Sequence, residues 1–185
     1  AVFRRFNDTM KLTAFELISD TSMRYVCQGH DLTPPMEEGS PYYALLEYEC
    51  GNTENEELAL QCFENCLDED MVVDGVISQS EAQAVDLWRF REGISEAITP
   101  FTPYKNDLSV RISEVPSFLN ALDEVVKDRY PDFEVLWYGH IGDGNLHMNI
   151  LKPEDMDLEI FEENCRAVNT EIFSLTKLHK GSISA

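Results

Sequence analysis

The sequence predicts an α+β fold, in which an antiparallel sheet of ferredoxin-like character has its helices packed on one face. Segments with strand and helix patterns alternate along the 185 residues. Asp143-Gly144, flanked by alternating apolar and polar residues, is a strong hairpin signal and therefore indicates antiparallel pairing. Hydrophobic residues make up 43% of the chain, which is enough for the core of one domain.

The first half of the chain is expected to alternate strands with helices. Hydrophobic patterning predicts three strands, at residues 12–18, 42–49 and 71–77. A short helical segment and the turn-rich loop 32–41 separate the first two strands. Amphipathic spacing predicts helices at residues 54–69 and 80–98. Ser78 or Ser80 can cap the second of these helices, and Pro100 stops it.

The second half continues the alternation. Strands are predicted at residues 107–112, 134–141 and 145–151, and helices at residues 113–130 and 154–180. Carboxylates concentrate in residues 154–163, where the positive end of the helix dipole favours them. We interpret this run as a solvated helix start, with a cation site as the alternative.

Charge and composition exclude several functions. The 35 acidic residues against 14 Lys and Arg give a net charge of −21, which repels nucleic acid and anionic lipid. No apolar stretch is long enough to span a membrane, and residues 1–6 lack the core of a signal peptide. The five cysteines, an odd number, favour a reducing compartment. We expect a soluble cytoplasmic protein, or one of the mitochondrial matrix in a eukaryote, with no nucleic acid partner.

Two of the cysteines lie four residues apart. Cys62 and Cys66 share a helical stripe with Ala59, Phe63 and Leu67. On such a stripe cysteine behaves as a small hydrophobic residue, so we predict core packing. A metal or redox pair is the alternative.

The hairpin of residues 137–150 carries the strongest functional signal. Pairing outward from a two-residue turn at Asp143-Gly144 sets His140 opposite His147. One face then carries the apolar residues Trp137, Ile141, Leu146, Met148 and Ile150. The other face carries Tyr138, His140, Asn145, His147 and Asn149. The first face is a core face, and the second is a candidate site.

The two histidines suggest a metal site. Opposed residues have Cβ atoms about 4.5 to 5.5 Å apart, so His140 and His147 can converge on one ion. Catalytic zinc commonly takes three protein ligands, and no acidic residue of the hairpin is placed as the third. Histidines that only form hydrogen bonds in a polar pocket are the alternative. A register shift of one residue would separate the two side chains.

The long helix of residues 80–98 holds two polar groups on an apolar stripe, Arg91 and Ser95. A buried arginine needs a carboxylate, which a substrate or an internal Asp or Glu can supply. Arg89 lies off the stripe and is interpreted as a solvated cation. Lys105 lies in a polar alternation and, on pattern alone, is a surface lysine.

Residues 139–149, Gly-His-Ile-Gly-Asp-Gly-Asn-Leu-His-Met-Asn, resemble the signature of a known domain. It is the C-terminal domain of FAD-linked oxidases and dehydrogenases in the vanillyl-alcohol oxidase superfamily, which includes D-lactate, glycolate and D-2-hydroxyglutarate dehydrogenases. Residues 87–92, 105–109 and 181–185 are similar to that domain in order and spacing. The resemblance therefore covers essentially the whole chain.

The resemblance implies roles for individual residues. His140 and His147 would bind a divalent metal, taken here as zinc, with Asn149 near the substrate. Arg91 and Lys105 would hold substrate carboxylates. Ser95 would help to orient them, although threonine is more usual at its position. A lysine at position 105 is a feature of the D-2-hydroxyglutarate-type enzymes, so a 2-hydroxy dicarboxylate is the expected substrate.

The resemblance also implies parts that this sequence does not contain. A flavin-binding domain would precede residues 1–185 and hold most of the FAD. A Glu-His-Gly segment would follow them with the third metal ligand and the proton acceptor, so no catalytic base is assigned. Expected partners are a small 2-hydroxy acid, an electron acceptor and a second copy in a homodimer. The alternatives are a D-lactate or glycolate dehydrogenase domain, a small-anion-binding regulatory module and a structural metal domain.

Overall fold

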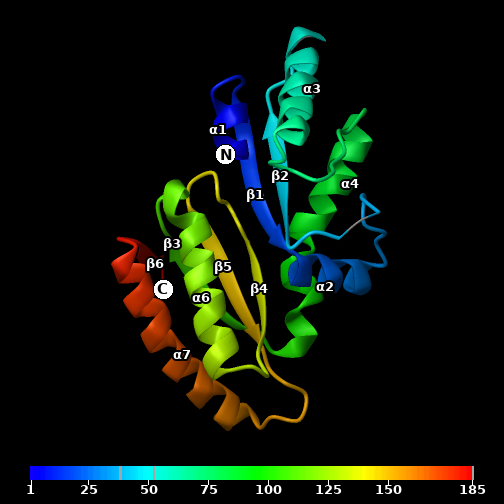
Figure 1. The fold of residues 1–185 in the computed structure, drawn as a ribbon. Coiled ribbons are helices and arrows are strands. Elements are labelled where there is room, and N and C mark those ends of the chain that lie inside the picture. Colours follow the sequence, from blue (N-terminus) through cyan, green and yellow to red (C-terminus); the bar gives the residue numbers. More distant parts are fainter. Residues whose placement is uncertain (38, 52, 185) are drawn as a thin grey trace.

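The computed structural model describes residues 1–37, 39–51 and 53–184. Its strands form one sheet in the order β2-β1-β4-β5-β3-β6, and the neighbouring strands are antiparallel (Figure 1). The strands are β1 (Leu12–Ser19), β2 (Tyr42–Tyr48), β3 (Tyr104–Ser109), β4 (Glu134–Gly139), β5 (Asn145–Leu151) and β6 (Ser182–Ser184). The predicted α+β class is confirmed.

Helices connect most of these strands. They are α1 (Val2–Asn7), α2 (Asp20–His30), α3 (Thr53–Asp68), α4 (Glu81–Glu92), α5 (Ile94–Ala97), α6 (Val115–Arg129) and α7 (Leu158–Leu178). Short 3₁₀ turns occupy Thr99–Phe101 and Ile112–Glu114. Ser80, one of the two predicted caps, accepts a hydrogen bond from the backbone N–H of Gln83 and begins α4. Within the described residues, no helix is both long and apolar enough to cross a membrane.

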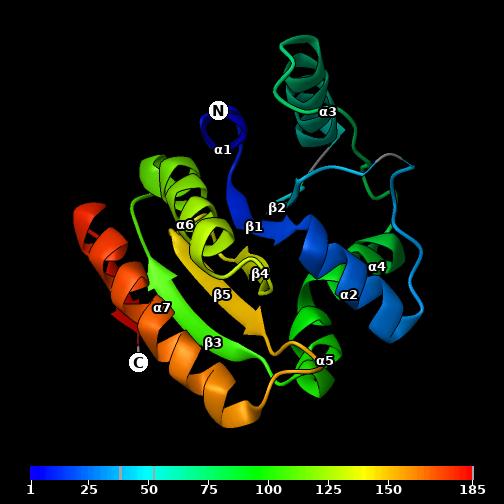
Figure 2. The same cartoon turned by 60° about the horizontal axis from the view of Figure 1, so that its bottom comes forward.

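Residues 104–184 form a ferredoxin-like unit. Their order along the chain is β3-α6-β4-β5-α7-β6, and their order in the sheet is β4-β5-β3-β6. Helices α6 and α7 lie side by side along this part of the sheet (Figure 2). Strands β1 and β2 extend the sheet beyond β4. The ferredoxin-like core expected from the sequence is therefore present, with an added β1-α2-β2 segment at one edge.

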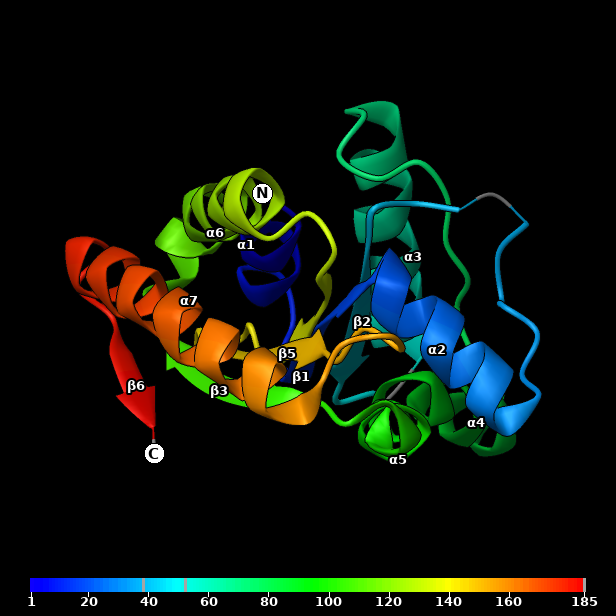
Figure 3. The same cartoon turned by 90° about the horizontal axis from the view of Figure 1, so that it is seen from below.

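The sheet has two different faces. The face under α6 and α7 carries the main core, with Trp137, Met148 and Ile150 among its buried residues. Leu136 and Tyr138 alternate with Trp137, so they point to the other face, where they join a second apolar cluster. Helices α2, α4 and α5 supply that second cluster and lie together, away from α6 and α7 (Figure 3). The sequence predicted that the helices pack on one face of the sheet, and this holds for α6 and α7 but not for α2, α4 and α5.

Several boundaries differ from those predicted. Residues 71–77 form no strand, because Met71 and Val72 do not join the sheet. They pack instead against a small apolar cluster of Phe6, Cys62 and Cys66, between α1 and α3. The strand predicted at 107–112 lies earlier in the chain, as β3. It ends before Val110, because the Val110 N–H donates to the Gly144 carbonyl. The long helix divides at Gly93, where His30 contacts the backbone carbonyl. Helix α1 and strand β6 were not predicted.

Gly144 provides a test of the loop between β4 and β5. Its φ of +82° is unfavourable for other residues, and a Cβ there would collide with the Val110 carbonyl. Gly144→Ala should therefore lower the free energy of unfolding by about 2 kcal/mol or more. Urea unfolding, monitored by circular dichroism, measures this change in stability. Gly51→Ala is the control, because nothing lies within 4 Å of a Cβ there. Equal stability of the two variants would contradict the loop geometry.

Candidate active site

The hairpin pairs in a different register from the predicted one. Tyr138 lies opposite His147, and Leu136 lies opposite Asn149. The strands are joined by residues 140–144 rather than by a two-residue turn, so His140 lies in the loop. The predicted pairing of His140 with His147 is therefore wrong, by a shift of two residues. An even shift preserves the alternation of faces, so His147 and Asn149 still share the side opposite the main core.

The loop nevertheless brings the two histidines together. The ring centroids of His140 and His147 are 5.8 Å apart, and the rings meet edge to face. His140 Nδ1 lies 2.7 Å from Glu16 Oε1, and His147 Nδ1 lies 2.6 Å from Asp107 Oδ1. Because an ionised carboxylate only accepts, each Nδ1–H is the donor, and in the neutral ring this leaves the lone pair on Nε2. This is the arrangement by which carboxylates orient metal-binding histidines.

Glu16 is a site residue that the sequence analysis missed. It lies on β1 with 2% of its surface exposed, and its second oxygen, Oε2, accepts a hydrogen bond of 2.7 Å from Arg91 Nε. Its sequence signal is a lone carboxylate within an apolar strand, next to Phe15 and Leu17. A buried charge of this kind requires partners, and partners on distant strands and helices are not visible in a strand pattern.

Arg91 is buried, as its place on the helix stripe predicted. Its carboxylate partner is internal, because Glu16 binds it, which was the alternative to a substrate carboxylate. The guanidinium carbon lies 4.9 Å from the centroid of the Tyr138 ring, in a cation–π contact. Among the described residues the Nη atoms of Arg91 make no hydrogen bond, so these donors remain for a ligand.

Tyr138 links the arginine to the histidines. One ring face is near Arg91, and the His147 ring centroid lies 5.1 Å from that of Tyr138. His147 contacts His140, which bonds to Glu16, which bonds to Arg91. The five side chains therefore form a closed circuit of contacts. They come from β1, α4, β4, β5 and the loop 140–144.

The remaining predicted residues lie along the same face. Lys105 is opposite Asn149 across the β3–β5 pair, and Asp107 is opposite His147. Lys105 Nζ lies 3.4 Å from Ser95 Oγ on α5, a long hydrogen bond. Asn149 is 1% exposed, and its Oδ1 has no hydrogen-bond partner among the described residues. A buried carbonyl without a donor is costly, so a donor from a ligand or from water would stabilise it.

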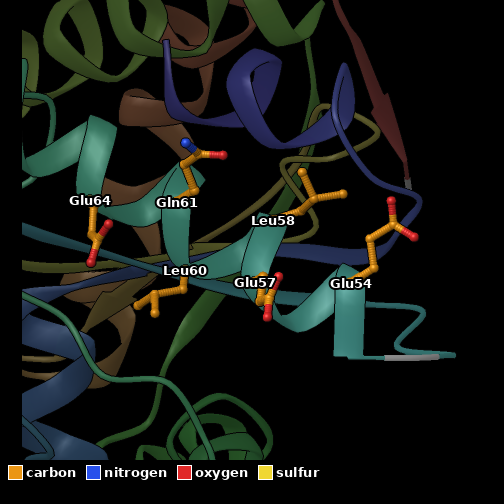
Figure 4. A pocket seen from close by; sticks show the side chains of 6 residues that line it. All are labelled: Glu54, Glu57, Leu58, Leu60, Gln61 and Glu64. Carbon is orange, nitrogen blue, oxygen red and sulfur yellow. The ribbon is translucent and has the colours of Figure 1, made fainter.

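Other candidate positions lie apart from this group. A shallow hollow on α3 is lined by Glu54, Glu57, Leu58, Leu60, Gln61 and Glu64, whose side chains radiate from the helix (Figure 4). Arg89 borders a second hollow and pairs with Asp86, which fits its interpretation as a solvated cation. Cys62 and Cys66 are free and buried beside Phe6, so core packing is confirmed. Burial also raises the pKa of the Cys66 thiol.

A complete metal centre is not present in the part of the chain that the structure describes. No group of three or more His, Cys, Asp or Glu side chains is arranged there to hold an ion. The acidic start of the last helix likewise forms no such group. Asp157 caps α7, and Lys152 Nζ donates to the carbonyls of Pro153 and Met156 just before it.

Comparisons with known proteins show the family of the chain. The family described as "FAD linked oxidases, C-terminal domain" matches residues 1–185. D-2-hydroxyglutarate dehydrogenase of Stutzerimonas stutzeri (strain A1501) is 50% identical over 184 residues, covering 100% of this chain and 40% of the relative. The enzyme of the same name from Xanthomonas citri pv. viticola is 46% identical, with 100% and 39% covered. The mitochondrial one of Arabidopsis thaliana is 35% identical, with 94% and 30% covered. The chain thus spans about two fifths of the length of its bacterial relatives.

Proposed function

The chain belongs to the C-terminal domains of the FAD linked oxidases, and from this membership we propose that it is the substrate- and metal-binding domain of an FAD-dependent D-2-hydroxyacid dehydrogenase. The proposed reaction oxidises D-2-hydroxyglutarate to 2-oxoglutarate. The main structural support is that two histidines bonded to carboxylates and a buried arginine lie in one group of contacts, on the face of the sheet opposite the main core. A relative that is 50% identical is named D-2-hydroxyglutarate dehydrogenase, which supports this choice of substrate.

The donor chemistry fits a divalent metal, which we propose is zinc. His140 and His147 would hold it through Nε2, and the unpartnered Oδ1 of Asn149 marks a nearby polar position. Such an ion supplies Lewis acidity that lowers the pKa of a hydroxyl. The third ligand must come from elsewhere in the protein, given that the described residues supply no third one.

The resemblance indicates where that ligand would come from. It implies a Glu-His-Gly segment directly after residues 181–185. Strand β6 pairs with β3 so that Ser184 lies opposite Asp107. A continuation of β6 would run toward Lys105 and bring a glutamate to the face that carries His147. We propose that this segment supplies both the third ligand and the base that takes the hydroxyl proton.

The substrate groups have matching partners in the chain. Arg91 would hold one carboxylate through its Nη atoms, and Lys105 would hold the distal one. Ser95 and Asn149 would orient the bound acid. Hydride would pass to FAD on another domain of the protein, and an electron acceptor would reoxidise the flavin. We also propose a homodimer in the cytoplasm, or in mitochondria in a eukaryote, where the Arabidopsis thaliana relative is placed by its name.

Substrate turnover tests the proposed function directly. The full-length protein should carry FAD and reduce an artificial dye with D-2-hydroxyglutarate, more efficiently than with D-lactate or glycolate. Preference for D-lactate or glycolate would assign the domain to the other dehydrogenases of the superfamily. Absence of flavin and of turnover with all three acids would favour a regulatory or structural module instead.

Lys105 provides a specificity prediction. Lys105→Ala should weaken transition-state binding of D-2-hydroxyglutarate by roughly 1.5 to 3 kcal/mol, the range for a hydrogen bond to a charged group. The ratio of the kcat/KM values of the wild type and the variant gives this energy. D-Lactate has no second carboxylate and should lose much less. Steady-state kinetics with both acids measures the difference, with Lys11→Ala, an exposed lysine paired with Glu49, as the control. Equal losses for the two acids would show that Lys105 does not bind the distal carboxylate.

A further inference from the structure

Glu16 joins two functional groups through one carboxylate. Oε1 accepts from His140 Nδ1 at 2.7 Å, and Oε2 accepts from Arg91 Nε at 2.7 Å. The side chain is 3% exposed, so water does not replace either partner easily. Its strand, β1, lies beside β4 in the sheet, which places the carboxylate between the loop 140–144 and helix α4.

The charges of this group balance. A buried carboxylate is strongly destabilising unless a cation and hydrogen bonds accompany it. Arg91, whose side chain is 10% exposed, supplies the positive charge, and His140 supplies the second donor. In the neutral ring of His140, a proton on Nδ1 leaves the lone pair on Nε2. The same contact fixes the rotation of the imidazole ring.

Asp107 performs only half of this role. It accepts from His147 Nδ1 at 2.6 Å, but its side chain is 49% exposed and it binds no cation among the described residues. It can orient one histidine. Glu16 differs because it fixes a histidine and an arginine relative to each other, across elements far apart in the sequence.

We propose that Glu16 is a positioning residue that couples metal binding to carboxylate recognition. This inference rests on the proposed function, in which His140 binds a divalent metal and Arg91 binds a substrate carboxylate. Glu16 contacts neither ligand and acts through the two residues that do. A change at Glu16 should therefore alter metal affinity and the KM for the acid together, whereas a change at Asp107 should alter mainly metal affinity.

The test uses the full-length holoenzyme with Zn²⁺ as the probe. Glu16→Gln keeps the size of the side chain but leaves one carbonyl for two donors. We expect Zn²⁺ affinity, measured against a competing chelator, to fall about 10- to 100-fold, as for other partners of metal-binding histidines. The KM for D-2-hydroxyglutarate should rise as well. Asp107→Asn should lower Zn²⁺ affinity with a smaller change in KM.

Glu134→Gln is the matched control. Glu134 also bridges two donors, Arg24 and Tyr25, but it joins α2 to β4 away from the site. It should leave Zn²⁺ affinity and KM unchanged, and thermal unfolding reports the stability of every variant. Should Glu16→Gln unfold, the double variant Glu16→Gln/Arg91→Met restores neutrality and leaves the carbonyl to His140. That variant should recover Zn²⁺ affinity but keep a high KM.

The outcomes separate this inference from the proposed function. Wild-type Zn²⁺ affinity and KM in Glu16→Gln would overturn the positioning role while leaving the proposed function intact. Equal losses in Glu134→Gln would also overturn it, because the effect would then be general destabilisation. A wild-type enzyme that neither binds Zn²⁺ nor oxidises D-2-hydroxyglutarate would overturn the proposed function, and the inference with it.

Discussion

Replacing His147 with alanine in the full-length enzyme is expected to abolish oxidation of D-2-hydroxyglutarate while leaving FAD bound. His147 supplies one of only two histidine nitrogens that the described part of the site offers to a metal. In the proposed mechanism, losing the ion would remove several kcal/mol of transition-state stabilisation, which corresponds to roughly a thousandfold or more in rate. The flavin would be held by another domain, so its absorbance should persist. Steady-state kinetics, flavin absorbance and zinc content measure the three quantities.

His179→Ala is the control for this substitution. His179 bonds to Glu114 and packs against Phe118, within the α6–α7 layer on the opposite side of the sheet. It should retain turnover and zinc. Full turnover in His147→Ala would mean that the ion is not catalytic or is not bound at this face.

The sequence predicted which hairpin residues face the core and which face the other way, but it did not predict the length of the loop. Alternation alone assigns Trp137 and Met148 to the main core and His147 to the opposite face of the sheet, and the structure confirms these assignments. The turn length depends on tertiary contacts: Ile141 is buried in the main core, and Gly142 N–H bonds to the Phe15 carbonyl on β1. These contacts favour a five-residue loop over the two-residue turn that Asp143-Gly144 indicates.

The partners of the predicted residues also escaped the sequence analysis. Glu16 is 124 positions from His140, and Asp107 is 40 positions from His147, so only the folded sheet brings each pair together. Lone carboxylates at such positions resemble ordinary strand residues in a chain with 35 acidic side chains. Strand β6 was not predicted because its three residues are too few to show an alternation of apolar and polar side chains.

Arg91 pairs with Glu16 and is proposed to bind a substrate carboxylate, so its substitution should have two measurable effects. Arg91→Met leaves Glu16 as a buried carboxylate without a cation, and breaking such a pair typically costs about 3 to 5 kcal/mol of folding free energy. The double variant Arg91→Met/Glu16→Gln should recover much of that stability, because it removes the unpaired charge. It should not recover wild-type kcat/KM, because no guanidinium remains to bind the substrate carboxylate. Urea unfolding and dye-coupled kinetics measure the two effects separately.

Arg91→Lys separates charge from geometry. A lysine ammonium can pair with Glu16, but it lacks the planar fork that binds Glu16 through Nε, stacks on Tyr138 and presents the Nη donors to a carboxylate. This variant should fold and yet lose about 100-fold or more in kcat/KM, since a well-oriented anchor is lost. Arg89→Lys, two residues earlier in α4 and paired with Asp86 at the surface, should match the wild type. If Arg91→Lys kept full activity, a positive charge alone would suffice, and bidentate recognition by Arg91 would be wrong.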